Sequence, residues 1–224
     1  MNGDADEFAE MALNLHDETS VDETVERVLE YGLKAVSCSY AGVIFVHGKK
    51  RVETVVATHP IVAELDKMQF DCGEGPDMDL LSKESSIMVA DIKSDERWPR
   101  WAEAVSGAGV HSLISVRMYT SSTTVGTLNL YDVEPNHFDH DDLAVAHVLA
   151  RHAAVALSTA RQEEHLWQAI DARKLIGQAQ GILMERYNMS ADQAFSVLLR
   201  YSQDKNIKLR VVAERLIATR ALPG

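Results

Sequence analysis

The chain opens with two segments whose apolar residues recur every three or four positions, the spacing of an amphipathic helix. The pattern is brief over residues 4–16 and clear over residues 21–37. Ser20 stands just before the second segment and Glu23 follows three residues later, which is the pattern of a capping box. We therefore expect two helices at the start of the chain. The stripe of the second comprises Val21, Val25, Val28, Leu29, Leu33 and Val36.

The next hundred or so residues favour strands. Residues 40–47 and 51–59 are rich in Val, Ile, Phe and Thr and flank Gly48, Lys49 and Lys50, which indicates a hairpin. A turn-rich patch at 72–77 leads into a short helical pattern at 78–83. Further strand patterns occupy 87–90, 110–120 and 125–133, and a helical pattern occupies 95–106. These elements predict an α+β module with about five strands flanked by helices.

A long helix is expected to follow, over about residues 139–175. Asp139 can cap it, and neither Gly nor Pro occurs from there until Gly177. Residues 139–170 alone would span roughly 46 Å at about 1.5 Å per residue. One stripe of this helix follows a heptad pattern: Ala146, Leu149, Ala153, Ala156, Ala160, Glu163, Trp167 and Ile170. Because the stripe is rich in Ala and contains Glu163, packing on its own domain and dimerisation are equally good interpretations.

The last fifty residues carry three short amphipathic patterns, at 174–187, 191–202 and 209–219. Ser190 and Gln193 form a second capping box, and residues 203–208 provide the turn before the final helix. We expect a small bundle of three helices here, with Phe195, Ala179 and Ala213 in its core.

Charge separates the two parts of the chain. Residues 1–160 carry 12 Lys and Arg against 27 Asp and Glu, a net −15, whereas residues 161–224 carry 10 against 7, a net +3. The total of −12 alone would argue against a polyanionic partner, but the contrast predicts two domains, 1–160 and 161–224, with different partners.

Several classes of protein find no support in the sequence. No run of 18 apolar residues occurs, and the acidic residues 1–10 do not resemble a signal peptide, so neither a membrane span nor secretion is expected. Cys38 and Cys72 are the two cysteines, which favours a reducing cytoplasm. No HExxH motif, no close Cys/His grouping and no glycine-rich phosphate loop occurs. We therefore expect no metal site, no cofactor and no catalytic residue.

Four stretches between residues 72 and 157, CGEGPDMDLL, SIMVADIKSDERWPRW, GVHSLISVRMY and VGTLNLYDVEPNHFDHDDLAVAHVLARHAAVAL, resemble a GAF domain over roughly residues 20–158. The resemblance implies a sensor in which an antiparallel sheet and flanking helices enclose a small-molecule pocket. Asp77 departs from it, since many similar sequences have Cys there, so a thiol-based role is not expected. The wall of the implied pocket would include Phe45, Met68, Phe70, Trp98, Trp101, Met118 and Leu128, although plain core packing would explain these residues too.

The segment ARKLIGQAQGILMERYNMSADQAFSVLLRYSQDKNIKLRVVAERLI resembles an ANTAR domain, over about residues 166–220. The resemblance implies a transcription antitermination factor that binds paired hairpins in nascent RNA. Cationic side chains would contact phosphates, and amide or hydroxyl groups would contact unpaired bases. Gln180 stands where the family often has Lys, so one cation is missing. The candidate RNA contacts are Arg173, Lys174, Gln178, Gln180, Arg200, Ser202, Asn206, Lys208, Arg210 and Arg215.

Together with these patterns, the two resemblances imply a cytoplasmic, non-catalytic and homodimeric regulator, in which a small-molecule signal at the sensor controls RNA binding. Two rival interpretations remain. The bundle could dock a protein, which would make the chain an adaptor, or the sensor could host thiol chemistry. Whether the candidate RNA contacts share one face of the bundle is left open by the sequence.

Overall fold

The computed structural model describes residues 2–18, 20–47, 51–82, 84–121 and 123–220, and the predicted turn at Gly48, Lys49 and Lys50 lies outside these ranges, as does Lys83. The described chain divides into two compact units, Met1–Arg161 and Gln162–Gly224. Each unit contains its own cluster of buried apolar residues, and they are described separately below.

The first unit is built on a five-stranded antiparallel sheet with strand order β2-β1-β5-β4-β3. The strands are β1 (Tyr40–His47), β2 (Arg51–Ala57), β3 (Ser86–Val89), β4 (Ser112–Tyr119) and β5 (Thr124–Asp132). All five correspond to segments with strand patterns in the sequence. Strands β4 and β5 pair with Ser115 opposite Asn129 and Arg117 opposite Thr127. Since side chains alternate between the faces of a sheet, these four polar residues lie on one face.

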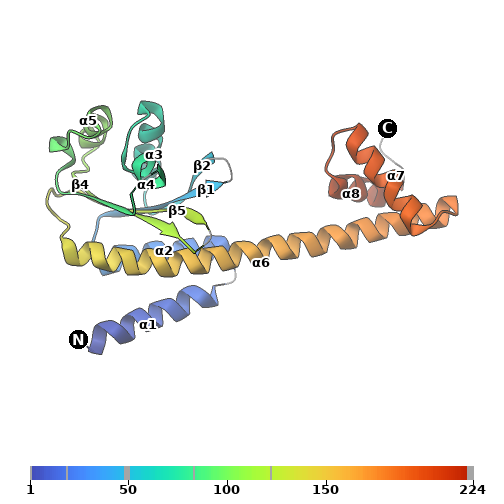
Figure 1. Ribbon diagram of the computed structural model, residues 1–224, viewed down its shortest axis with the longest axis horizontal. Coiled ribbons are helices and arrows are strands. Elements are labelled where there is room, and N and C mark those ends of the chain that lie inside the picture. The colour runs from blue at the N-terminus through green and yellow to red at the C-terminus, as the bar shows by residue number, and fades with distance from the viewer. Residues whose placement is uncertain (1, 19, 48–50, 83, 122, 221–224) are drawn as a thin grey trace. The chain divides into compact units, whose positions relative to one another are not determined.

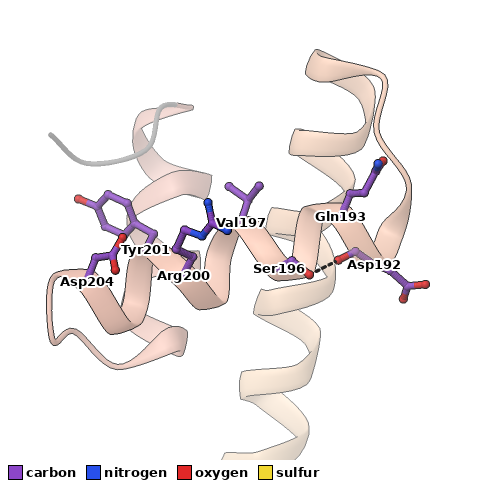
Figure 2. A pocket seen from close by; sticks show the side chains of 7 residues that line it. All are labelled: Asp192, Gln193, Ser196, Val197, Arg200, Tyr201 and Asp204. Atoms are coloured by element: carbon purple, nitrogen blue, oxygen red, sulfur yellow. Dashed lines mark hydrogen bonds between the residues drawn. The ribbon is translucent and has the colours of Figure 1, made fainter.

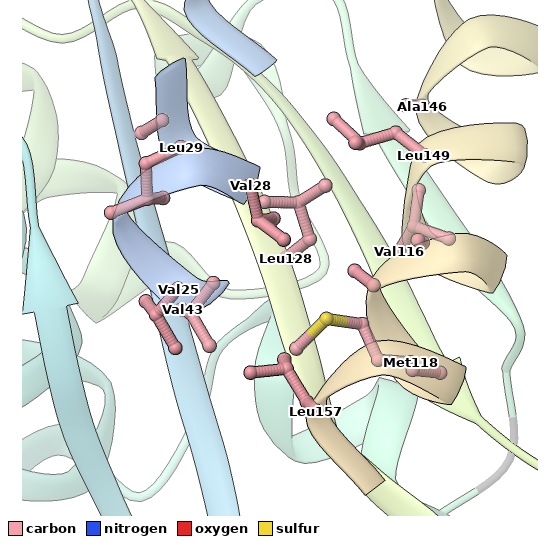
Figure 3. Packing of buried hydrophobic residues seen from close by; sticks show 14 of the residues in the cluster. Val25, Val28, Leu29, Val43, Val116, Met118, Leu128, Ala146, Leu149 and Leu157 are labelled. Carbon is pink, nitrogen blue, oxygen red and sulfur yellow. The ribbon is translucent and has the colours of Figure 1, made fainter. Parts of the chain in front are cut away.

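The opposite face of the sheet is covered by α2 (Val21–Ala35) and the first part of α6 (His140–Tyr187), and α1 (Asn2–Asp17) packs against α2 on the side away from the strands (Figure 1). Val25, Val28 and Leu29 of α2 meet the sheet beside Leu149 and Leu157 of α6 (Figure 3). These side chains are almost completely buried, and each such burial stabilises the fold by about 1.5–3 kcal/mol. The predicted N-cap of α2 is present, because the Ser20 side chain accepts a hydrogen bond from the Glu23 backbone N–H at 3.2 Å.

The polar face of the sheet is covered by α3 (Pro60–Cys72), α4 (Pro76–Ser82), the short 3-10 helix η2 (Ile92–Ser94) and α5 (Pro99–Gly107) (Figure 1). The α3 segment carries no element predicted from the sequence. Its N-cap is His59, whose Nδ1 accepts from the Ile61 N–H at 3.2 Å, and Pro60 occupies the first turn. The helix ends at Gly73, which has a positive φ of 69°. A histidine cap is a weak sequence signal, which explains why the helix was missed.

The long helix α6 is continuous over 48 residues. Its cap was predicted correctly, since Asp139 Oδ1 accepts hydrogen bonds from the backbone N–H groups of Asp141 and Asp142 at 2.8 and 3.1 Å. The prediction of a separate helix over 174–187 was wrong, because α6 runs through Gly177 and Gly181 without a break. A glycine costs a helix only about 1 kcal/mol, whereas the last turns of α6 gain a buried contact with the C-terminal helices.

The heptad stripe of α6 has two different environments. Ala146, Leu149, Ala153, Ala156 and Ala160 are buried in the core of the first unit, so this part packs on its own domain. Past Arg161 the stripe emerges: Trp167 is 65% exposed and Ile170 is 44% exposed. Among the described residues, α6 is the one helix long and apolar enough to pass a composition test for a membrane span, and 44% of its most apolar stretch is buried inside the protein.

The second unit combines the last turns of α6 with α7 (Ala191–Asp204) and α8 (Leu209–Thr219). Ser190 and Gln193 form the predicted capping box of α7, with both reciprocal hydrogen bonds present. Ala179 and Ala213 are fully buried as predicted. The expectation for Phe195 was wrong, because its side chain is 39% exposed and the small Ala194 beside it takes the core position.

Candidate functional site

The buried polar centre of the first unit surrounds Asp77, at the start of α4. Its carboxylate accepts hydrogen bonds from Thr127 Oγ1 at 2.6 Å, Gln69 Nε2 at 2.6 Å and Asn129 Nδ2 at 3.0 Å. Gln69 Oε1 in turn accepts from the Asp77 backbone N–H at 2.9 Å. This network ties α3 and α4 to β5 through side chains that are fully buried.

Burial dominates the electrostatics of this centre. It raises the pKa of Asp77, although the hydrogen bonds from Thr127, Gln69 and Asn129 oppose that change. Burial also raises the pKa of Tyr131 well above its usual value, and the neighbouring carboxylate of Asp66 adds to the effect. Tyr131 donates a hydrogen bond to Asp66 Oδ1 at 3.3 Å. The polar face of the sheet therefore carries a network of hydrogen bonds between buried side chains.

Part of the hydrogen-bonding capacity of this face remains unused. Among the described residues, Ser115 Oγ, Asn129 Oδ1 and Arg117 Nε are buried atoms without a hydrogen-bond partner. Native proteins leave few buried polar atoms unpaired, so each requires an explanation. All three belong to the polar patch on β4 and β5 that faces α3 and α4.

A second set of polar contacts links the helices that cover this face of the sheet to one another. Glu74 accepts hydrogen bonds from the backbone N–H groups of Arg100 and Trp101, at 2.6 and 3.2 Å, and pairs with the Arg100 guanidinium at 3.1 Å. Burial opposes ionisation of Glu74, but these hydrogen bonds together hold its pKa below the usual value. Trp98 Nε1 donates to Asp79 Oδ2 at 3.0 Å, which joins α4 to the start of α5. Both contacts therefore join the α3–α4 region to the N-terminal end of α5.

Cys38 is poorly placed for thiol chemistry. Cys38 is buried, and burial raises the pKa of its thiol to about 12, so the thiol is protonated at neutral pH. Among the residues that the structure describes, no three His, Cys, Asp or Glu side chains gather closely enough to hold a metal ion.

The three-helix unit presents cations on its surface. Arg173 and Lys174 are exposed on α6, Arg200 on α7, and Lys208 and Arg215 at or within α8. Arg200 lines a hollow of about 570 Å³ along α7, shown in Figure 2. The other lining residues are Asp192, Gln193, Ser196, Val197, Tyr201 and Asp204.

Comparison with known families identifies both units. A GAF domain model matches residues 18–158, and an ANTAR domain model matches residues 164–217. The chain belongs to the GAF domain family. The ANTAR domain follows the GAF domain in the order predicted from the sequence. GAF domains are sensors and ANTAR domains are RNA-binding regulatory domains, and both are generally soluble and non-catalytic. The chain is thus, in general terms, a GAF-regulated RNA-binding regulator of the ANTAR type.

Solved structures confirm the fold of the GAF domain. A domain of a putative sensor histidine kinase from Sinorhizobium meliloti shares 18% identity with a TM-score of 0.56, covering 66% of this chain and 98% of that chain. The GAF domain of an Acinetobacter phosphoenolpyruvate-protein phosphotransferase shares 11% identity with a TM-score of 0.57, covering 72% and 96%. The GAF domain of a phosphoenolpyruvate-protein phosphotransferase from Coxiella burnetii shares 16% with a TM-score of 0.57, covering 70% and 94%. No curated protein matches the chain.

The seven residues predicted for the GAF pocket do not form one wall. Phe45, Met118 and Leu128 belong to the core between the sheet and α2 and α6. Trp98 and Trp101 belong to the core beneath α3 and α5, on the other face, and Met68 packs against it. Phe70 is 41% exposed and belongs to neither core. The separation follows from strand alternation, since Met118 and Leu128 have the opposite parity to Arg117 and Asn129.

The polar residues around Asp77 were not predicted as a site from the sequence, although Asp77 itself stood out as a departure from similar sequences. A signal was present: Thr127 and Asn129 alternate with Leu128 and Leu130 in β5, which marks one face as polar. Sequence alone does not indicate that this polar face is buried. The polar face is buried because α3, which was not predicted as a helix, covers it and contributes Gln69.

Three of the ten candidate RNA contacts have partners within the ANTAR domain. Gln180 Nε2 donates to the Ala191 carbonyl at 3.1 Å, Ser202 Oγ donates to the Ile207 carbonyl at 2.6 Å, and Arg210 pairs with Glu214 at 2.8 Å. The other seven are exposed: Arg173, Lys174, Gln178, Arg200, Asn206, Lys208 and Arg215. Arg200 and Gln178 line different hollows, so the structure does not gather the whole set at one site.

Proposed function

We propose that this protein is a signal-responsive transcription antitermination regulator whose ANTAR domain binds two hairpins of a nascent RNA. The observation that carries the proposal is the exposure of Arg173, Lys174, Arg200, Lys208 and Arg215 on a folded ANTAR domain. Residues 161–224 have a net charge of +3, against −15 for residues 1–160, so this unit is where polyanion binding is favoured. Binding would occur in the cytoplasm.

A titration of the full chain against a two-hairpin RNA and a scrambled control of equal length tests the proposal. We expect tighter binding to the two-hairpin RNA, with an affinity that falls as salt rises. Equal affinity for both RNAs would refute sequence-selective hairpin recognition.

A homodimer is part of the proposal, because two ANTAR domains would engage two hairpins and linkage would multiply the affinity. Its support is the exposed apolar surface of α6 beyond the GAF core, formed by Leu166, Trp167 and Ile170. Sedimentation of the chain at micromolar concentration, free and with the two-hairpin RNA, should show a dimer at least in the complex. A monomer in both conditions would contradict this part of the proposal.

We further propose that the GAF domain receives a small-molecule signal at the polar face of its sheet. The unpaired polar atoms of Ser115, Arg117 and Asn129 beneath α3 and α4 support this location. The apolar pocket residues predicted from the sequence give this location less support, because they lie on both faces of the sheet. A signal that shifts α3 or α4 would act on β5 through the Asp77 network.

A protein-interaction adaptor is the second candidate function. Exposed apolar side chains on the ANTAR domain favour it, since such residues occur at protein interfaces. They are Met184, Tyr187, Phe195 and Leu199. The salt dependence of the binding affinity distinguishes the two candidate functions, because docking through apolar side chains depends on salt far less than RNA binding does.

A further inference from the structure

A second hollow of the ANTAR domain lies between α6 and α8 and measures about 530 Å³. This volume is within the range of about 300–1,000 Å³ that is usual for ligand sites. Both helices contribute to it, so its shape depends on the folded bundle. Its lining residues are Gln178, Gly181, Ile182, Glu185, Ile217 and Arg220.

Gly181 has no evident role in the packing of the chain itself. A Cβ atom built there would meet no atom within 4 Å among the described residues, and the residue lies within α6 without a positive φ. Two glycines of the GAF domain differ from it, because a Cβ at Gly42 would lie 2.6 Å from Val62 Cγ1 and one at Gly126 would lie 1.9 Å from the Ile44 carbonyl oxygen. What distinguishes Gly181 from Gly177, a helical glycine that is equally free of contacts, is that Gly181 lines the hollow and leaves the backbone of α6 open there. Glycine is unfavourable inside a helix, so an open backbone at this place suits a partner that approaches through the hollow.

The lining of the hollow suits the edge and the faces of a nucleic-acid base. Gln178 can donate and accept hydrogen bonds, and the Glu185 carboxylate can accept from amino and imino groups. Ile182 and Ile217 provide apolar surface for a flat ring. Bases in single-stranded RNA loops are recognised in this way, by hydrogen bonds at their edges and contacts with their faces.

Cations next to the hollow complement the phosphates of the same strand. Lys174 is exposed one helical turn before Gln178, and residues four apart share a helix face. Arg220 lines the hollow and ends α8, where its carbonyl accepts a hydrogen bond from Arg186 Nη1. This contact fixes the backbone that carries the Arg220 side chain. A single strand of RNA therefore fits this surface better than an apolar protein segment does.

We propose that the hollow between α6 and α8 receives an unpaired base of the bound RNA, and that Gly181 lacks a side chain so that this base can approach the backbone of α6. The inference rests on the proposed function, that the ANTAR domain binds RNA. It assigns the recognition of a loop base to Gln178, Gly181 and Glu185, and leaves phosphate contacts to Lys174 and Arg220.

The test compares Gly181→Ala and Gly181→Leu with Gly177→Ala, all in the full chain. Gly177 is a matched control, since a Cβ there also meets no atom within 4 Å and the residue does not line the hollow. All three variants should melt at a higher temperature than the wild type, because each replaces a helical glycine. Gly181→Leu should bind the two-hairpin RNA at least roughly tenfold more weakly, since it fills a recognition site, and Gly181→Ala should show a smaller loss. Gly177→Ala should bind as the wild type does.

Unchanged affinity of the Gly181→Leu variant would overturn the inference, and so would an equal loss in Gly177→Ala, which would indicate a general effect on α6. If Gly181→Leu melts at a lower temperature than the wild type, the RNA affinity of Gly181→Ala is the deciding measurement. An unchanged affinity of Gly181→Ala would then overturn the inference. Failure of the wild type to prefer the two-hairpin RNA over the scrambled RNA is a different result, and it would refute the proposed function.

Discussion

At the scale of single residues, the informative positions are polar side chains that are buried in the middle of a strand, where apolar residues are usual. Thr127 and Asn129 lie in a central strand and are fully buried, where they donate to Asp77. Strand alternation in the sequence correctly separates them from Leu128 and Leu130. Their partner lies fifty residues earlier in the chain, and only the tertiary fold brings it to them.

The buried carboxylate of Asp77 should make stability depend on pH. The folded-state pKa of Asp77 lies above its ordinary value of 3.8, so the folded protein takes up this proton more readily than the unfolded chain does. The stability linked to protonated Asp77 is fully present below pH 3.8 and is lost as pH rises through the raised pKa. Each unit of difference in pKa corresponds to about 1.4 kcal/mol.

We therefore expect the wild type to gain stability relative to Asp77→Asn as pH falls from neutrality toward 3.8. Urea denaturation of both proteins at several pH values measures this gain. Asn keeps an oxygen that can accept from Thr127 but cannot ionise, so it is the matched control. Parallel stability profiles for the two proteins would show that Asp77 does not titrate as inferred.

Ser202 offers a second test at this scale. Its hydroxyl donates to the Ile207 carbonyl at 2.6 Å across the turn between α7 and α8, so its role here is structural. Ser202→Ala should lower the free energy of unfolding by about 0.5–1.5 kcal/mol and leave RNA affinity unchanged in a binding titration. Arg200→Ala is the contrasting variant and should weaken RNA binding with little effect on stability. A loss of RNA affinity in Ser202→Ala that exceeds its effect on folding would restore Ser202 as an RNA contact.

At the scale of elements, caps were predicted well and helix breaks were not. Ser20, Asp139 and Ser190 each accept the expected hydrogen bonds, because a cap depends on residues within one turn of it. The continuity of α6 through Gly177 and Gly181 could not be predicted in this way. It depends on the contact that the last turns of α6 make with α7 and α8.

The capping box of α7 gives a prediction for this element. Ser190→Ala removes the acceptor of the Gln193 N–H and should destabilise α7 by about 1 kcal/mol. Amide hydrogen exchange in the first turn of α7 should accelerate accordingly. Ser196→Ala is the control, because the Ser196 hydroxyl donates to the Asp192 carbonyl within the same helix and caps nothing. Equal acceleration in both variants would contradict the assigned role of Ser190.

At the scale of the whole molecule, the separation of charge is the feature that bears most on function. The acidic GAF domain and the comparatively basic ANTAR domain differ in net charge although α6 runs through both. A protein with a net charge of −12 can then still bind RNA, provided that contacts are confined to the C-terminal unit.

RNA binding by the full chain should therefore depend strongly on salt. Each phosphate neutralised on a single strand contributes a slope of about 0.7 to the plot of log affinity against log salt. With exposed cations at Arg173, Lys174, Arg200, Lys208 and Arg215, contact with three to five phosphates would give a slope of roughly 2–3.5. Titrations between low and physiological salt measure it. A slope near zero would favour the adaptor instead.

Resemblance to known families indicated a GAF domain followed by an ANTAR domain. Beyond that, the sequence by itself determined what depends on neighbours in the chain: the strands, the helix caps and the contrast in charge. These follow from periodicity, capping and composition, which act over a few residues or sum over many. Only the tertiary structure decided which polar residues meet. Asp77 reaches Thr127 and Asn129, and Gln178 lines a hollow with Ile217, because packing joins segments that lie far apart in sequence. Packing also separated Phe45 from Trp101, because Phe45 lies on β1 in the core with α2 and α6, whereas Trp101 lies on α5, which covers the other face of the sheet.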